Sequence, residues 1–143
     1  MRFLGIGQSL PANIVTNKEI ESLTPGSNAE WIEHKLGIQE RRISINDTVV
    51  TLGSASATEA LKDSGLSKND IDLIIVNTSS ADKVSPSVAC MIQEKLGLTC
   101  PAFDINAVCT GFIYALEISS LMLNKYKNIL IVSTETYSKI TNW

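Results

Sequence analysis

The chain has 143 residues, of which 44% are hydrophobic and 19% charged, and 12 basic against 15 acidic side chains give a net charge of −3. This composition is typical of a globular protein that buries a core, and it excludes a disordered chain. Charges of neither sign cluster, so nucleic acid and anionic membranes are excluded as main partners.

The first predicted element is a strand from Arg2 to Gln8. Its apolar run is interrupted by Gly5 and Gly7 and is followed by no small-residue cleavage site, so a signal peptide is not indicated. No segment has the length of a membrane-spanning helix, and we expect a cytoplasmic protein without nucleic-acid or membrane partners.

Two short helices are predicted next, each from a possible capping box. Thr16 with Glu19 precedes a helix from Lys18 to Leu23, and Ser27 with Glu30 precedes a helix that carries Trp31 and stops at Gly37. An extended piece is expected at Arg41–Ile45.

The rest of the chain alternates helices with buried strands. Asp47 is the expected cap of a long helix that small residues line at 53–57, and Ser85-Pro86 are the expected N-cap and first residue of another. The predicted helices and strands are, in order, the helix Thr48–Ser64 closed by Gly65, the strand Ile71–Asn77, the helix from Pro86 closed by Gly97, the strand Ala102–Ile105, the helix Thr110–Lys125 and the strand Asn128–Ser133. This order predicts an α/β layered domain with a largely parallel sheet, and the apolar residues around the helix after Cys109 place that helix in a core.

Cys109 is the candidate nucleophile, because it lies where a strand runs directly into that helix. Unpaired backbone N–H groups and the helix dipole favour a thiolate there, and the N–H of Cys109 can donate to an oxyanion. We expect the missing side chain of Gly111 to let an acyl group approach the backbone. The alternative, a small buried hydrophobe, stays open for Cys109 and is the interpretation of Cys90 and Cys100. The three cysteines have no metal-ligand spacing and no Cys-x-x-Cys pair, so free thiols are expected, and neither a metal nor a redox function.

The segment around Cys109 resembles the active-site segment of β-ketoacyl-acyl-carrier-protein synthase III, whose pattern is D-x-N-x-x-C-x-G-F. Further similarities follow in order along the chain, at Gly5-Ile6-Gly7, Leu10-Pro11, Glu30-Trp31-Ile32, Gly37-Ile38, Glu40-Arg41-Arg42, Pro86-Ser87 and Ser133-Thr134-Glu135. The resemblance implies that residues 1–143 are the N-terminal half-domain of a thiolase-like fold, with a mixed, largely parallel sheet and a buried central helix, and that the C-terminal half is absent from this chain.

The resemblance implies an acyltransferase of fatty acid biosynthesis. A cysteine, here Cys109, accepts an acyl group from acyl-CoA, and the enzyme then condenses this group with malonyl-acyl-carrier protein, losing carbon dioxide. The expected partners are acyl-CoA as substrate, acyl-carrier protein, a second copy in a homodimer and the missing half, with no cofactor.

Four further positions carry expectations from the family. Trp31 matches a tryptophan that stacks on the CoA adenine, Lys35 stands where an arginine often meets CoA, and Ser27 stands where a CoA-contacting threonine is common. The alternatives are an amphipathic-helix anchor for Trp31 and a plain helix cap for Ser27. Ser85 replaces a phenylalanine that closes the acyl pocket in many members, which implies a longer or branched acyl primer.

The family's condensing histidine and asparagine come from the other half. His34, the single histidine, is interpreted as a surface or packing residue. Two alternatives therefore stay open: a related thiolase-fold acyltransferase of secondary metabolism, and a non-catalytic half that scaffolds a partner. Without its other half, the apolar helix after Cys109 should expose a large hydrophobic patch.

Overall fold

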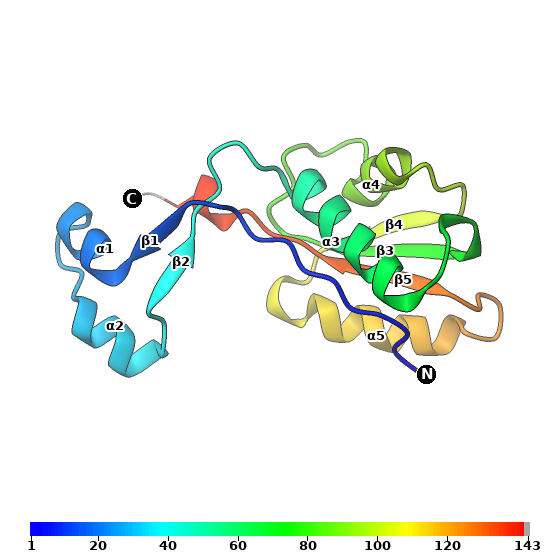
Figure 1. Cartoon of the computed structure of the whole chain (residues 1–143), viewed down its shortest axis with the longest axis horizontal. Helices are drawn as coiled ribbons and strands as arrows, with labels where there is room; N and C mark the ends of the chain where they lie inside the picture. Colours follow the sequence, from blue (N-terminus) through cyan, green and yellow to red (C-terminus); the bar gives the residue numbers. More distant parts are fainter. Residues whose placement is uncertain (142–143) are drawn as a thin grey trace. The chain divides into compact units, whose positions relative to one another are not determined.

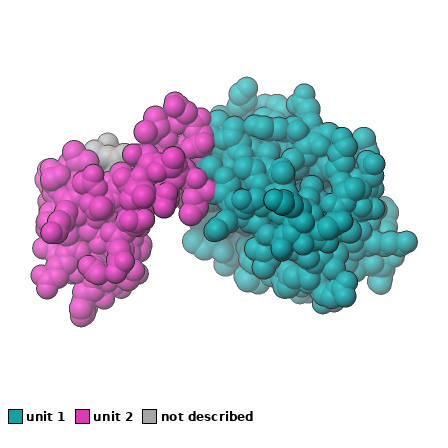
Figure 2. Space-filling view, viewed as in Figure 1, with its two compact units in different colours: residues 1–9, 48–135 teal, residues 10–47, 136–143 magenta. Residues whose placement is uncertain are grey.

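A computed structural model describes residues 1–141 and divides the chain into two compact units, coloured separately in Figure 2. Unit 1 consists of residues 1–9 and 48–135, and unit 2 of residues 10–47 with those from 136 onward. No helix within residues 1–141 is long and apolar enough to cross a membrane.

A three-stranded parallel sheet forms the centre of unit 1. Strands β3 (Leu73–Asn77), β4 (Ala102–Ile105) and β5 (Ile129–Ser133) lie in the order β4-β3-β5, and β3 is parallel to both neighbours. Every residue of β3 is buried, because helices cover both faces of the sheet. The predicted parallel sheet and its buried strand are thus confirmed.

Three helices complete the layers of unit 1. In Figure 1, α3 (Val49–Ser64) and α4 (Val88–Leu96) cover one face of the sheet, and α5 (Gly111–Met122) covers the other. Ile74 and Val76 of β3 join the core beneath α3 and α4, whereas Leu73 and Ile75 face α5. The predicted α/β layering follows directly from this alternation along one strand.

The predicted strand Arg2–Gln8 is wrong, because this segment pairs with no strand of residues 1–141. Instead, the N–H groups of Ile6 and Gln8 donate to the carboxylates of Asp63 and Glu59 on α3, each at 2.9 Å. A Cβ atom on Gly7 would lie 2.1 Å from the carbonyl oxygen of Ser56, so two backbones meet at the small-residue stretch of α3.

Two predicted helix caps of unit 1 are wrong by one or two residues. Helix α3 is capped by Thr48 rather than Asp47, since the Thr48 hydroxyl accepts the N–H of Thr51 at 3.0 Å. Ser87 rather than Ser85 caps α4, with its hydroxyl accepting the N–H of Cys90. The side chain that reaches the third helical N–H group is the cap, whatever its neighbour could do.

Unit 2 consists of a β-hairpin-like pair and two short helices. Strands β1 (Ile14–Thr16) and β2 (Glu40–Arg42) are antiparallel, and α1 (Asn17–Leu23) and α2 (Ala29–Leu36) connect them. The predicted capping box of Thr16 and Glu19 is confirmed for α1. The box predicted from Ser27 is wrong, because Asn28 accepts the N–H of Trp31 at 2.7 Å.

Helix α5 packs on the sheet along one side only. Its buried residues are Gly111, Ala115 and Ser119, whereas Ile113 is 60% and Leu121 70% exposed. The apolar sequence predicted packing on several sides, and within unit 1 the outer side of α5 is open. This exposed apolar face is the patch expected of the chain without its other half.

Candidate functional site

Cys109 lies at the carboxyl end of the parallel sheet, where ligand sites of α/β folds gather. It is the middle residue of a 3-10 turn, Val108–Thr110, that joins β4 to α5, and its thiol is exposed. Within residues 1–141, Cys109 is therefore exposed and is not a small buried hydrophobe.

The N-terminus of α5 follows Cys109 immediately. Thr110 makes no side-chain cap, since its hydroxyl donates back to the carbonyl of Ala107 at 2.8 Å, and no acidic residue occupies the first turn of α5. Because no side-chain cap and no first-turn carboxylate occupies this helix terminus among residues 1–141, its positive potential favours a negative charge next to Cys109.

Val108 holds an unusual backbone conformation directly before Cys109. Its φ of 47° lies in the left-handed region, which a β-branched residue rarely adopts. The N–H of Val108 donates to Oγ of Ser79 at 3.1 Å, and Nδ2 of Asn77 donates to its carbonyl at 3.5 Å. Both polar backbone groups of this residue thus have partners at the end of β3.

A polar network surrounds these contacts. Oγ of Ser79 donates to Oδ1 of Asn106 at 2.8 Å, and the carboxylate of Glu135 accepts the N–H of Ser79 at 2.8 Å. Glu135 also accepts the hydroxyl groups of Thr78 and Ser80. The residues come from the carboxyl ends of three parallel strands, so the sheet brings them together although the sequence separates them.

Sequence reasoning missed Asn77 and Ser79, and it used Glu135 only as a point of resemblance. The available signal was that a polar residue follows each of three buried apolar runs, at Asn77, Asn106 and Ser133. In a parallel sheet such positions meet at one edge.

The structure explains the glycine at position 111 by packing, and not by the space for an acyl group that the sequence suggested. A Cβ atom at this position would lie 1.7 Å from Oδ1 of Asn77, so the space is filled by that amide rather than left for an acyl group. Oδ1 of Asn77 is buried and has no hydrogen-bond partner among residues 1–141.

Asp104, the first residue of the cysteine segment's pattern, acts on α4. Its two carboxylate oxygens accept the N–H groups of Val88 and Ala89 at 2.8 and 2.7 Å. A carboxylate at a helix N-terminus satisfies unpaired donors and complements the dipole. Asp104 therefore fixes α4 onto β4.

The other two cysteines differ from each other. Cys100 is buried as predicted, and this burial is the main cause that raises the pKa of its thiol. A backbone hydrogen bond lowers the pKa in part, and the charge of Asp72 raises it by a smaller amount. Cys90 was expected among core residues, and this is wrong: its side chain is exposed at the surface of α4. Cys90 and Cys109 are thus two exposed thiols in different backbone settings.

Ser85 is exposed and lies in the segment between β3 and α4. This segment belongs to unit 1, as does Cys109. Ser85 has room for an adjoining group, which is the property that its expected position in an acyl pocket requires.

The three expected CoA-binding residues lie in unit 2. Trp31 and Lys35 are one turn apart on α2 and share a face, and Trp31 is 55% exposed. Oγ of Ser27, before α2, is buried and has no hydrogen-bond partner among residues 1–141, which excludes the alternative of a helix cap. His34 is exposed on the last turn of α2, which agrees with its interpretation as a surface residue.

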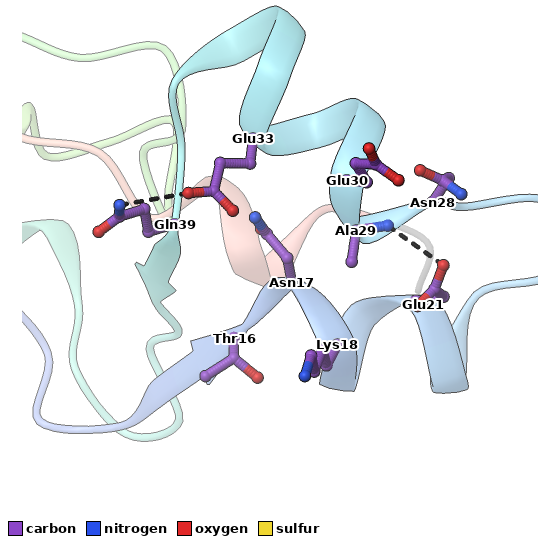
Figure 3. Close-up of a pocket in the computed structure, with 9 residues that line it drawn as sticks. All are labelled: Thr16, Asn17, Lys18, Glu21, Asn28, Ala29, Glu30, Glu33 and Gln39. Carbon is purple, nitrogen blue, oxygen red and sulfur yellow. Dashed lines mark hydrogen bonds between the residues drawn. The ribbon is translucent and has the colours of Figure 1, made fainter.

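Figure 3 shows a pocket of unit 2 on the other side of α2. It is lined by Thr16, Asn17, Lys18, Glu21, Asn28, Ala29, Glu30, Glu33 and Gln39. Its carboxylates outnumber its one ammonium group, and Glu33 accepts Nε2 of Gln39 while Glu21 accepts the N–H of Ala29. An acidic lining repels phosphates, so this pocket is unsuited to CoA, and Trp31 with Lys35 point away from it by helical periodicity.

Comparisons with known proteins agree on one family. A family model described as 3-oxoacyl-acyl-carrier-protein (ACP) synthase III matches residues 103–143, which include Cys109. Beta-ketoacyl-acyl-carrier-protein synthase III of Clostridium acetobutylicum is 46% identical over 100% of this chain and 45% of its own length.

Solved structures give the same result. The 3-oxoacyl-acyl-carrier-protein synthase III of Aquifex aeolicus VF5 superposes with a TM-score of 0.93 at 40% identity, over 98% of this chain and 46% of that one. The priming β-ketosynthase of the R1128 polyketide pathway gives a TM-score of 0.88 at 34% identity, over 94% of this chain and 41% of that one. The chain thus has the thiolase-like α/β fold of these enzymes and spans about half the length of the relatives it matches.

Proposed function

We propose that this chain, a homologue of β-ketoacyl-acyl-carrier-protein synthase III along its whole length, is the acyl-accepting half of such an enzyme. The observation that carries the proposal is the exposed thiol of Cys109 between the carboxyl end of β4 and the uncapped N-terminus of α5. The segment matched by the family model includes this cysteine.

The first step is acyl transfer from CoA to Cys109. The Cys109 thiolate attacks the thioester carbonyl carbon, forming a new C–S bond and a tetrahedral oxyanion. The backbone N–H of Cys109 and the N-terminal end of α5 stabilise that oxyanion. When the oxyanion collapses, the bond to the CoA sulfur breaks, CoA leaves as a thiolate, and the acyl group stays on Cys109.

The second step needs the whole protein. Decarboxylation of malonyl-acyl-carrier protein gives a carbanion that attacks the Cys109 thioester; the bond between the acyl carbon and the Cys109 sulfur breaks, so that carbon dioxide, a β-ketoacyl product and the Cys109 thiolate result. In the family, a histidine and an asparagine of the C-terminal half assist this step, and exposed His34 on α2 replaces neither. We therefore expect the chain alone to take up an acyl group at most. Acyl-carrier protein and a second copy in a homodimer are further partners of the whole enzyme, which works in the cytoplasm.

Coenzyme A binds through unit 2 in this proposal. The exposed indole of Trp31 stacks on adenine, and Lys35, one turn later, meets a phosphate as a point charge without the planar fork of an arginine. Ser27 is the third candidate of unit 2, and its Oγ, which is buried and has no partner among residues 1–141, has to become accessible before it can meet CoA.

Ser85 makes room for a longer or branched acyl primer, because a small exposed side chain stands where the resemblance to the family implies a phenylalanine in many members. A complete enzyme that takes acetyl-CoA far faster than medium-chain acyl-CoA would contradict this part of the proposal.

Release of CoA tests the acyl transfer itself. The protein is mixed with octanoyl-CoA in single turnover, and free CoA is measured by chromatography. We expect up to one equivalent from the wild type and from Cys90→Ser, and none from Cys109→Ser. Equal release from wild type and Cys109→Ser would refute the assignment of Cys109.

A second candidate is the priming ketosynthase of a polyketide pathway, favoured by the 34% identity to the R1128 enzyme. The acceptor distinguishes the two: a fatty-acid acyl-carrier protein supports turnover of the whole enzyme in the first case, and a polyketide carrier protein in the second.

A further inference from the structure

The conformation of Val108 needs an external support. A φ of 47° is costly for a β-branched residue, by about 1–3 kcal/mol in general. Such a conformation persists only where the surroundings over-determine it. Val108 is itself half exposed, so packing of its side chain does not supply the support.

Besides the turn's own hydrogen bond from the Gly111 N–H to the Val108 carbonyl, hydrogen bonds from the residues at and after the end of β3 supply it. Oγ of Ser79 accepts the Val108 N–H at 3.1 Å and donates to Oδ1 of Asn106 at 2.8 Å, so one hydroxyl bridges two residues of the connection between β4 and α5. Nδ2 of Asn77 reaches the Val108 carbonyl. Released from these partners, Val108 would return to negative φ and rotate Cys109 away from α5.

Glu135, two residues after β5, holds the backbone of Ser79 in place. Its carboxylate accepts the backbone N–H of Ser79 at 2.8 Å and the hydroxyl of Ser80, and it thereby holds the loop that carries Ser79. A charged acceptor makes such hydrogen bonds stronger than neutral ones. The chain of contacts therefore runs from Glu135 through Ser79 to Val108 and Cys109.

We propose that Ser79 and Glu135 are positioning residues for the nucleophile: they hold Val108 in its left-handed conformation and thereby present the Cys109 thiol to the N-terminus of α5. Neither residue touches the acyl group. The inference rests on the proposed function, in which Cys109 is the nucleophile, but its test requires no acyl-CoA.

The test is the rate at which iodoacetamide alkylates each cysteine of the whole chain, followed by peptide mass spectrometry. Cys90 is exposed on α4 and serves as an internal reference, and buried Cys100 reports unfolding. The variants are Ser79→Ala, Ser79→Thr, which keeps the hydroxyl, and Ser56→Ala as a matched control. The Ser56 hydroxyl donates only to the carbonyl of Gly53 within α3.

We expect the alkylation rate of Cys109, relative to that of Cys90, to fall about fivefold in Ser79→Ala. A change of this size corresponds to the net contribution of one ordinary hydrogen bond. Ser79→Thr and Ser56→Ala should keep the wild-type ratio. A merely structural role would change all three cysteines together. An unchanged ratio in Ser79→Ala with Cys100 still protected would overturn the proposal.

Glu135→Gln decides the case if Ser79→Ala exposes Cys100. The amide keeps the shape of the side chain and one acceptor oxygen but loses the charge. A lowered Cys109 to Cys90 ratio with protected Cys100 supports the proposal, and a wild-type ratio overturns it. This test uses iodoacetamide and no acyl-CoA, so its result does not depend on acyl transfer. A failure of the positioning proposal can therefore be distinguished from a failure of the proposed function.

Discussion

Gly111 and Asn77 approach each other so closely that a Cβ atom on Gly111 would lie 1.7 Å from Oδ1 of Asn77. The contact joins the first turn of α5 to the carboxyl end of β3, next to Cys109. It explains the glycine two residues after the cysteine by packing against a buried amide, and it makes that glycine a structural requirement of the site.

Gly111→Ala should therefore destabilise unit 1, although alanine favours a helix over glycine. Overpacking at this position requires Asn77 to move, and we expect a loss of about 2 kcal/mol in the free energy of unfolding by urea. The matched control is Ser120→Ala, at an exposed position of the same helix, which should change stability little. Equal stability of Gly111→Ala and wild type would mean that Asn77 has room to move.

The N-cap of α3 gives a second prediction, because mutations can distinguish the two neighbouring candidates for this cap, Asp47 and Thr48. Thr48→Ala removes the hydroxyl that accepts the N–H of Thr51, and should cost about 1 kcal/mol in the free energy of unfolding. Asp47→Ala removes the carboxylate that the sequence suggested as the cap, and should cost much less. The reverse order in urea denaturation would restore Asp47 as the cap.

Acid should weaken the start of α1. The hydroxyl of Thr16 first, and its backbone N–H second, hold the pKa of Glu19 below its ordinary value by hydrogen bonds to the carboxylate, which burial opposes slightly. A lowered folded-state pKa means that the stabilisation is present above the unfolded pKa, about 4.3, and is lost as the pH falls through the folded pKa.

NMR titration of the Glu19 carboxyl measures this effect directly. In Thr16→Ala the side-chain hydrogen bond is gone and the backbone bond remains, so the midpoint should move part of the way back to the ordinary value. A midpoint that stays where the wild type has it would show that the Thr16 hydroxyl does not cause the shift.

Trp31 provides a prediction for substrate binding. If its indole stacks on adenine, Trp31→Ala should raise the KM for acyl-CoA of the whole enzyme about tenfold, the weight of one base–aromatic stack. An acyl-pantetheine thioester lacks adenine and should show no such change. Leu36→Ala, at another exposed apolar residue of α2, is the control and should leave both KM values unchanged. A loss that is equal for both thioesters would contradict stacking.

Local patterns in the sequence predicted most of unit 1, because its strands are continuous apolar runs and its helices α3 and α4 end at glycines. Gly65 and Gly97 both adopt the left-handed conformation that stops a helix, as does Gly37 after α2 in unit 2. The failed prediction of a strand at Arg2–Gln8 has a physical reason: a strand exists only beside a partner, and this segment gives N–H groups to Glu59 and Asp63 instead.

The position of the candidate nucleophile was predictable from the sequence, but the residues that support it were not. Cys109 is marked by its place between a strand and a helix, which is a local property. Ser79 and Glu135 act on the turn from other strands, and only the parallel pairing of β3 with β4 and β5 brings them there. The order of residues in the sequence does not show which strands pair with one another.

Intact mass spectrometry after incubation with a panel of acyl-CoA compounds tests the central claim most directly. The account predicts a single acyl adduct on the wild type and on Cys90→Ala, and none on Cys109→Ala. The acyl chain taken up most readily also tests the role given to Ser85. An adduct that persists in Cys109→Ala, or a full-length protein that forms none, would contradict the account.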